Sequence, residues 1–107
     1  MEMARYIYRI LRSNPIIMMS WGFHDAYAVE DGLRFSVDGY IHSGSVQVKY
    51  NAVTDLFDVS TFNKDGSTKN HIEDIYLDCL IPTIDGMVER TPDYEERVKR
   101  DYLVIEK

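Results

Sequence analysis

Apolar and polar residues alternate along three successive stretches in the middle of the chain. The apolar side of this alternation carries Leu33, Phe35, Val37 and Ile41, then Val46, Val48 and Tyr50, and finally Phe57, Val59 and Thr61. Successive side chains of a β-strand point to opposite faces of the sheet, so each stretch predicts a strand with one inward face. Turn-forming residues at 30–32, 42–44 and 51–55 separate the stretches. The pattern predicts an antiparallel sheet with one covered face and one solvated face.

The residues upstream of these stretches add to the predicted sheet and place a helix before it. We predict that segments 16–23 and 26–29 are extended, which makes a meander of four or five strands. From Met3 to Ser13, apolar residues fall on one side of a helical wheel and three arginines on the other. The Asn14-Pro15 pair ends this helix, because a residue before proline is pushed out of the α region.

A second helical pattern occupies the C-terminal part of the chain. Asn70 is a good helix cap, Glu73 follows three residues later, and apolar residues recur at helical spacing over residues 72–88. Pro82 falls inside this pattern, so we expect a kink near it.

The last residues predict a short tail helix. Thr91-Pro92 is a good helix start, and the tail helix extends to Arg100. Residues 101–107 fit either helix or strand. The chain of 107 residues is therefore expected to form a single α+β domain with its helices on one sheet face.

The apolar side of residues 72–88 is wide for a helix that lies on a domain surface. It covers about 240° of the wheel, whereas an ordinary surface helix has an apolar stripe of about 100°. A small domain can hardly surround a helix. We therefore expect either that this helix is buried deep between two layers, or that a second copy of the chain in a homodimer, or a partner protein, covers part of its apolar side. Cys79 falls on this side and is expected to be an inert core thiol.

Charge is spread unevenly over the chain, whose formal net charge is −6. Residues 1–14 carry +2, residues 15–89 carry −8, and residues 90–107 are balanced. The acidic middle repels phosphates, so direct nucleic-acid binding is disfavoured. Four carboxylates share one side of the predicted second helix, namely Asp74, Asp78, Asp85 and Glu89. This acidic stripe is a candidate partner-binding surface, and one alternative function is an inhibitor whose carboxylates imitate nucleic-acid phosphates.

The stretch from residue 61 to residue 74 contains the residue types of a calcium loop. An EF-hand loop needs oxygen ligands at positions 1, 3 and 5, glycine at 6 and glutamate at 12. With Gly66 at position 6, Thr61 occupies position 1 and Ile72 occupies position 12, so two ligand positions fail. We therefore predict a turn at residues 63–66. The histidines and the cysteine lack metal-ligand spacing, and no phosphate loop occurs, so neither a metal nor a cofactor is expected.

His24 and Asp25 form the only adjacent pair of a histidine and a carboxylate. An aspartate can orient an imidazole for acid–base catalysis. Neighbours on a strand point to opposite faces, however, which disfavours a catalytic pair. A pocket formed by Trp21, His24, Asp25 and Tyr40 is kept as a second alternative, as part of a small-molecule binder or an enzyme. No residue is assigned a catalytic role.

The main expectation is a non-catalytic accessory or protein-interaction domain. A single cysteine cannot close an internal disulfide, so nothing indicates an oxidising compartment. The longest apolar run, Ile16 to Met19, is too short to span a bilayer. We therefore expect a cytoplasmic protein without membrane attachment.

Overall fold

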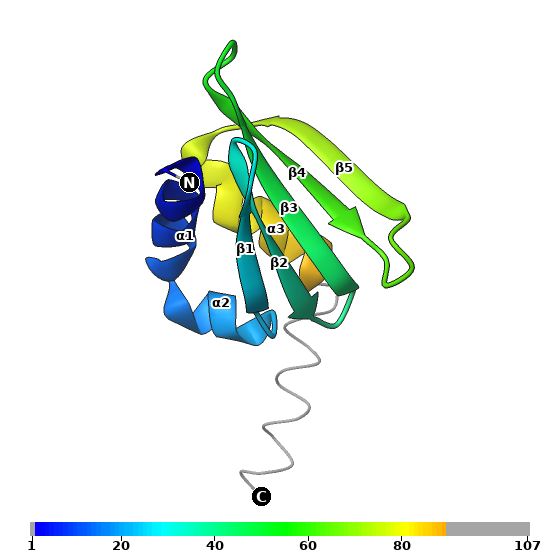
Figure 1. Ribbon diagram of the computed structural model, residues 1–107. Coiled ribbons are helices and arrows are strands. Elements are labelled where there is room, and N and C mark those ends of the chain that lie inside the picture. The colour runs from blue at the N-terminus through cyan, green and yellow to red at the C-terminus, as the bar shows by residue number, and fades with distance from the viewer. Residues whose placement is uncertain (1, 90–107) are drawn as a thin grey trace, which may run out of the picture.

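Five antiparallel strands follow one another across one sheet in chain order (Figure 1). In the computed structural model, which describes residues 2–89, the strands are β1 (His24–Val29), β2 (Gly32–Asp38), β3 (Ser43–Asn51), β4 (Leu56–Phe62) and β5 (Thr68–Ile75). Before the sheet come helices α1 (Glu2–Arg12) and α2 (Pro15–Ser20). After it come a short 3-10 helix, η1 (Leu77–Cys79), and helix α3 (Leu80–Val88). The α+β class and the meander order predicted from the alternation are confirmed.

The predicted inward faces of the central strands are also confirmed. Val48 of β3 lies directly opposite Val59 of β4, and both side chains are fully buried. Phe35, Val48 and Val59 belong to one apolar core together with Ile75 and Leu80. Burial of an aliphatic or aromatic side chain of this size stabilises folding by about 1.5–3 kcal/mol. This shared core holds the sheet to its helices.

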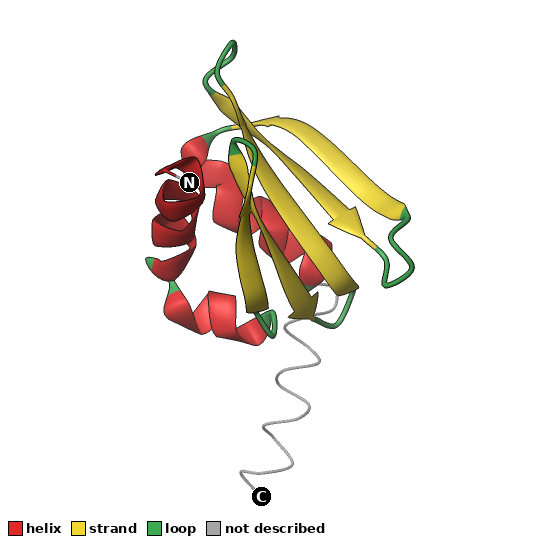
Figure 2. Cartoon of the chain, in the orientation of Figure 1, coloured by secondary structure: helices red, strands yellow, loops and turns green. Residues whose placement is uncertain are grey.

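The helices leave one face of the sheet uncovered. Figure 2 shows the helices of the described chain beside and behind the sheet, with the front of the strands open. Helix α1 buries Ala4, Ile7 and Leu11, while the arginines predicted on its other side are exposed. Helix α3 buries Leu80, Ile84, Met87 and Val88. The prediction that the helices share one sheet face is therefore confirmed.

The segment predicted to be extended at 16–23 contains a short helix instead. Pro15 is the first residue of α2, where its missing N–H has no helical partner to lose. The Asn14 side chain accepts a hydrogen bond from the Ile17 N–H at 3.5 Å, so Asn14 caps α2 as well as following α1. The prediction was wrong because Asn-Pro was read only as the end of one helix.

The predicted helix start at Asn70 is wrong, since Thr68–Ile75 form β5. This strand pairs with β4, and the Asn70 N–H donates to Thr61 Oγ1 at 3.1 Å. Two register shifts interrupt the pairing, and Asp74 has a positive φ of 58°. Because a bulge interrupts the period-two alternation, the apolar positions Ile72 and Ile75 fell by coincidence at helical spacing.

Pro82 does not kink a long helix, because α3 begins only two residues before it. A proline in the first turn removes an N–H that would have no intrahelical partner. The predicted tail helix from Pro92 to Arg100, and residues 101–107, lie outside the described residues. Among residues 2–89, no helix combines the length and the apolar character needed to cross a membrane.

Candidate functional site

The structure places the four residues predicted to form one pocket in different surroundings. Trp21 is fully buried; its ring stacks on Phe35 at 6.4 Å between centroids, and its Nε1 donates to Asp85 Oδ1 at 3.0 Å. Tyr40 lies in the β2–β3 loop with its side chain exposed, and its N–H donates to Glu89 Oε2 at 3.0 Å. Of the four predicted residues, only His24 borders a cavity on the open sheet face.

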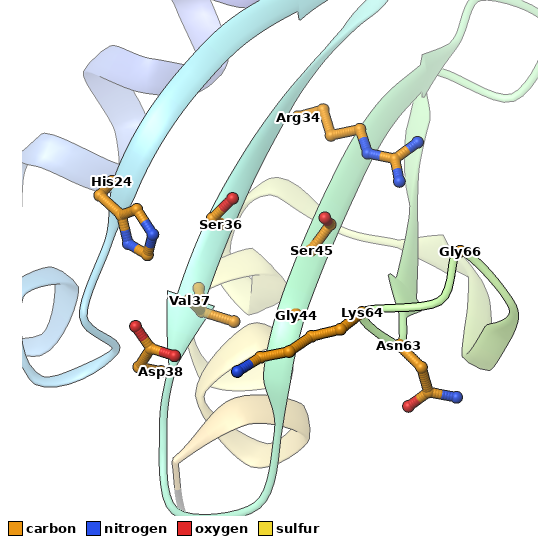
Figure 3. A pocket seen from close by; sticks show the side chains of 10 residues that line it. All are labelled: His24, Arg34, Ser36, Val37, Asp38, Gly44, Ser45, Asn63, Lys64 and Gly66. Carbon is orange, nitrogen blue, oxygen red and sulfur yellow. The ribbon is translucent and has the colours of Figure 1, made fainter.

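That cavity is a polar basin of about 380 Å³ on the uncovered face, shown in Figure 3. Cross-strand register explains its centre, because His24 of β1 lies opposite Ser36 of β2, and Ser36 lies opposite Ser45 of β3. Arg34 lies two residues before Ser36, so it shares the same face. The β4–β5 hairpin brings Lys64 to the same place. The remaining lining residues are Val37, Asp38, Gly44, Asn63 and Gly66.

Gly44 lines the basin and has no side chain that would occupy it. A Cβ at this position would lie 2.2 Å from the carbonyl oxygen of Phe62, which is far inside contact distance. Glycine therefore allows β3 and the end of β4 to approach closely.

The turn predicted at residues 63–66 is confirmed, and it positions one wall of the basin. The Gly66 N–H donates to the Asn63 carbonyl at 2.9 Å, and the Asn63 N–H donates to the Ser67 carbonyl at 2.8 Å. Hydrogen bonds from the Ser67 hydroxyl and N–H to Asp65 lower the pKa of that carboxyl. Asp65 therefore serves the turn. Within residues 2–89, no group of three metal-ligating side chains is placed to hold an ion.

Two cations of the basin have no carboxylate partner in the described chain. The guanidinium carbon of Arg34 lies 4.4 Å from the centroid of the Phe62 ring, a cation–π contact that fixes its position. Neither Arg34 nor Lys64 forms an ion pair with a residue of the range 2–89. Figure 3 shows the Lys64 side chain lying across Gly44 with its amino group directed toward Asp38. The basin thus gathers positive charge on a protein that is negative overall.

Two serines, a histidine and an aspartate add polar groups to the lining of the basin. The hydroxyls of Ser36 and Ser45 make no hydrogen bond to another described residue. His24 Nδ1 lies 2.6 Å from the Gly22 carbonyl, which can only accept, so Nδ1 carries the hydrogen. Its other nitrogen, Nε2, is 3.8 Å from Asp25 Oδ2. Asp38 is the one carboxylate of the lining and accepts from the Ser43 hydroxyl at 3.3 Å.

A serine, a histidine and a glutamate are linked beside the basin. Ser60 Oγ lies 2.6 Å from His71 Nδ1, and His71 Nε2 lies 3.0 Å from Glu73 Oε1. This order matches nucleophile, base and orienting acid. The side chains of His71 and Glu73 are 44% and 66% exposed, and Ser60 does not line the basin. The contact between Ser60 and His71 joins β4 to β5 on the sheet surface.

The predicted acidic stripe is dispersed. Asp74 lies in β5 and Asp78 in η1, so they do not share a helix face with the others. Asp85 accepts the hydrogen bond from Trp21. Glu89 is buried, and desolvation raises the pKa of its carboxyl although the Tyr40 N–H opposes this. Two of the four carboxylates therefore accept internal hydrogen bonds, and the four do not form one row on a helix.

Cys79 is exposed, whereas the sequence predicted a core position. The error follows from the helix boundary, because Cys79 ends η1 rather than lying inside a long helix. Partial desolvation and the neighbouring Asp78 carboxylate raise the pKa of the thiol. A raised pKa decreases the thiolate fraction and hence the reactivity of the cysteine.

Arg34, Ser36, Ser45 and Lys64 were not predicted as site residues. Arg34, Ser36 and Ser45 occupy polar positions of the alternation, so the sequence predicted that they face solvent. It did not predict that they line one basin. Lys64 was predicted only as part of a turn. No family model, curated protein or solved structure was found to match this chain.

Proposed function

We propose that this protein is a non-catalytic protein-interaction domain that recognises an anionic group of a partner in the basin on its open sheet face. The observation that carries the proposal is the pair of cations, Arg34 and Lys64, without a carboxylate partner in the described chain. The anionic group is a carboxylate or a phosphate, because both accept hydrogen bonds from guanidinium, ammonium and hydroxyl groups.

The positions of the donors support this proposal. Ser36 and Ser45 are opposite each other on neighbouring strands, so their hydroxyls lie side by side between the two cations. Arg34 is held against Phe62 and loses little side-chain entropy when it binds an anion. Asp38 on the rim repels groups of high negative charge, which favours a single anion positioned on the Arg34 side.

The proposal is tested by titrating the full chain with N-acetylglutamate and with O-phosphoserine while recording amide chemical shifts. We expect shifts centred on Ser36, Ser45 and Lys64, and weaker binding at high salt. Replacing Arg34 and Lys64 together with alanine should lower affinity by about tenfold or more.

Lys49→Ala is the matched control, because Lys49 lies on β3 opposite Asp58 and does not line the basin. This variant should bind both probes as the unaltered chain does. Shifts that are absent, or that persist when Arg34 and Lys64 are both replaced, would overturn the proposal. Binding of only one probe identifies which anion the partner presents.

Self-association through residues 72–88 is a second proposal, now restricted to the apolar side chains of this segment that are exposed. Ile72, Tyr76 and Leu77 are 41%, 64% and 46% exposed. A contiguous exposed apolar patch commonly marks an interface. Sedimentation velocity of the full chain over a concentration series should show a dimer that Tyr76→Ser weakens; a monomer throughout would reject it.

The cytoplasm is the proposed location. It is supported by the single cysteine, which offers no partner for an internal disulfide. Fractionation of cells that produce the full chain tests this point, and recovery in a membrane or secreted fraction would contradict it.

A further inference from the structure

The edge strand β1 differs from the central strands in its burial. In β2, β3 and β4 the inward-facing positions are buried, whereas β1 exposes every residue from His24 to Ala28. Ala28 lies opposite the buried Leu33, so Ala28 belongs to the core side of the sheet. The core layer therefore stops short of β1, although the sheet continues.

An apolar groove of about 400 Å³ lies between α1 and β1 as a result. Its walls are the side of α1 that carries Tyr8 and the backbone and small side chains of β1. Phe23 contributes to it and contacts Tyr8, with ring centroids 5.9 Å apart. Ala26 and Ala28 fill little of this space, so the groove has room for aliphatic side chains from another segment.

The outer edge of β1 presents backbone groups without partners in the described chain. The strand pairs only with β2, and no other backbone hydrogen bond joins it to residues 2–89. A register shift between His24 and Tyr27, with a positive φ of 52° at Asp25, distorts its first half. Regular pairing with an added strand is thus available mainly from Tyr27 to Val29.

The α1 wall of the groove is basic. Arg5 lines it, and Arg12 lies with its guanidinium carbon 6.0 Å from the centroid of the Tyr8 ring. Arg5, Tyr8 and Arg12 follow helical spacing, so they form one stripe along the groove. None of the arginines of α1 forms an ion pair with a carboxylate of the described range.

We infer that an extended segment of a partner protein, which turns both aliphatic and acidic side chains toward α1, adds to β1 and fills this groove. Backbone hydrogen bonds to Tyr27–Val29 supply affinity, as in other strand-addition complexes. Aliphatic side chains occupy the space above Ala28, and acidic side chains reach Arg5 and Arg12. The site lies at the sheet edge beside α1, apart from the basin residues, so it does not depend on the anion site proposed above.

Charge distinguishes this occupant from two others. A second copy paired through β1 would bring two arginine stripes toward one another, which is unfavourable. Residues 90–107 of the same chain carry five acids and five bases, so they offer no net negative charge to the stripe. An acidic segment of another protein matches both the apolar and the basic parts of the groove.

The probe is the synthetic heptapeptide Glu-Thr-Val-Thr-Glu-Thr-Val, whose glutamate and valine side chains share one face of an extended strand. It is compared with the counterpart in which lysine replaces glutamate, and each peptide is added to the full chain. We expect the acidic peptide alone to shift the amide resonances of Tyr8 and residues 26–29. Arg5→Glu should weaken its binding by about tenfold or more, because a favourable contact becomes a repulsive one. Ala28→Glu should do the same by filling the groove with a negative charge.

Arg9→Glu is the matched control, since it changes the net charge equally but Arg9 does not line the groove. It should leave affinity within about twofold. Equal losses for Arg5→Glu and Arg9→Glu, or equal binding of both peptides, overturn the inference. It is also overturned if the β1 amides that point away from β2 are already protected from hydrogen exchange in the free chain. Protection in a monomer then indicates residues 90–107 as the occupant, and protection that grows with concentration indicates a second copy.

Discussion

The two faces of the sheet are built from alternating residues of the same strands, yet they differ in every physical respect. On the covered face, Phe35, Val46 and Val48 have no exposed surface. On the open face, their neighbours Arg34 and Ser36 are half-buried. Within the described residues, Arg34 forms no ion pair and the Ser36 hydroxyl forms no hydrogen bond. Residues that stabilise the core and residues of the proposed binding face therefore alternate along the same strands, so one set can be replaced while the other is kept.

The largest change in unfolding free energy is expected for Phe35→Ala, which is compared with Ser36→Ala on the other face. Phe35 is fully buried and contacts the rings of Trp21 and Phe23, so its truncation should cost about 3–5 kcal/mol of unfolding free energy. Ser36→Ala should change the unfolding free energy by no more than about 0.5 kcal/mol. Urea denaturation of both variants gives these free energies. Similar losses for the two variants would contradict the claim that the two faces contribute differently to stability.

Trp21→Phe should have an intermediate effect. The variant keeps an aromatic ring in the core but removes the N–H that donates to Asp85, leaving a part-buried carboxylate without this donor. We expect a loss of about 1–3 kcal/mol. Urea denaturation in a double-mutant cycle with Asp85→Asn isolates the pair. A coupling energy near zero would show that the bond does not tie α3 to the end of α2.

The smallest expected effect is the pH dependence due to His42. This ring is buried and its Nε2–H donates to the Ser45 carbonyl at 3.2 Å, while desolvation lowers the pKa of the ring below the ordinary 6.5. The unfolded chain therefore takes up this proton first as pH falls, so folding stability declines from about pH 6.5 down to the lower folded pKa. Thermal unfolding between pH 5 and 8 should show this slope.

His42→Asn should flatten that slope, because it removes the buried titrating ring. A slope that persists unchanged in His42→Asn would show that another group causes it.

Much of the fold was predictable because its signals are local. The alternation around Phe35, Val48 and Val59 identified three strands and their inward faces, and the Asp-Gly pair identified the β1–β2 turn. The two errors, α2 and β5, fall where one signal has two meanings. Asn14-Pro15 both ends a helix and starts one, and the bulges of β5 conceal its alternation.

The candidate site was predictable only in part. Arg34, Ser36 and Ser45 were assigned to the solvated face by their positions in the alternation. Their meeting with Lys64 depends on the hairpin that follows β4, and that hairpin was expected to lead into a helix. The burial of Trp21 and Glu89 likewise follows from contacts between segments that are far apart in the chain.

The amino-acid sequence by itself determined the α+β class, the inward faces of the central strands and the turn at residues 63–66, because alternation and turn chemistry act between near neighbours. The tertiary structure alone decided that β5 is a strand, which cations share the basin, and that the core stops before β1. Those features depend on which backbone edge finds a partner and how far the helices extend over the sheet. Both are settled by long-range packing rather than by any local pattern.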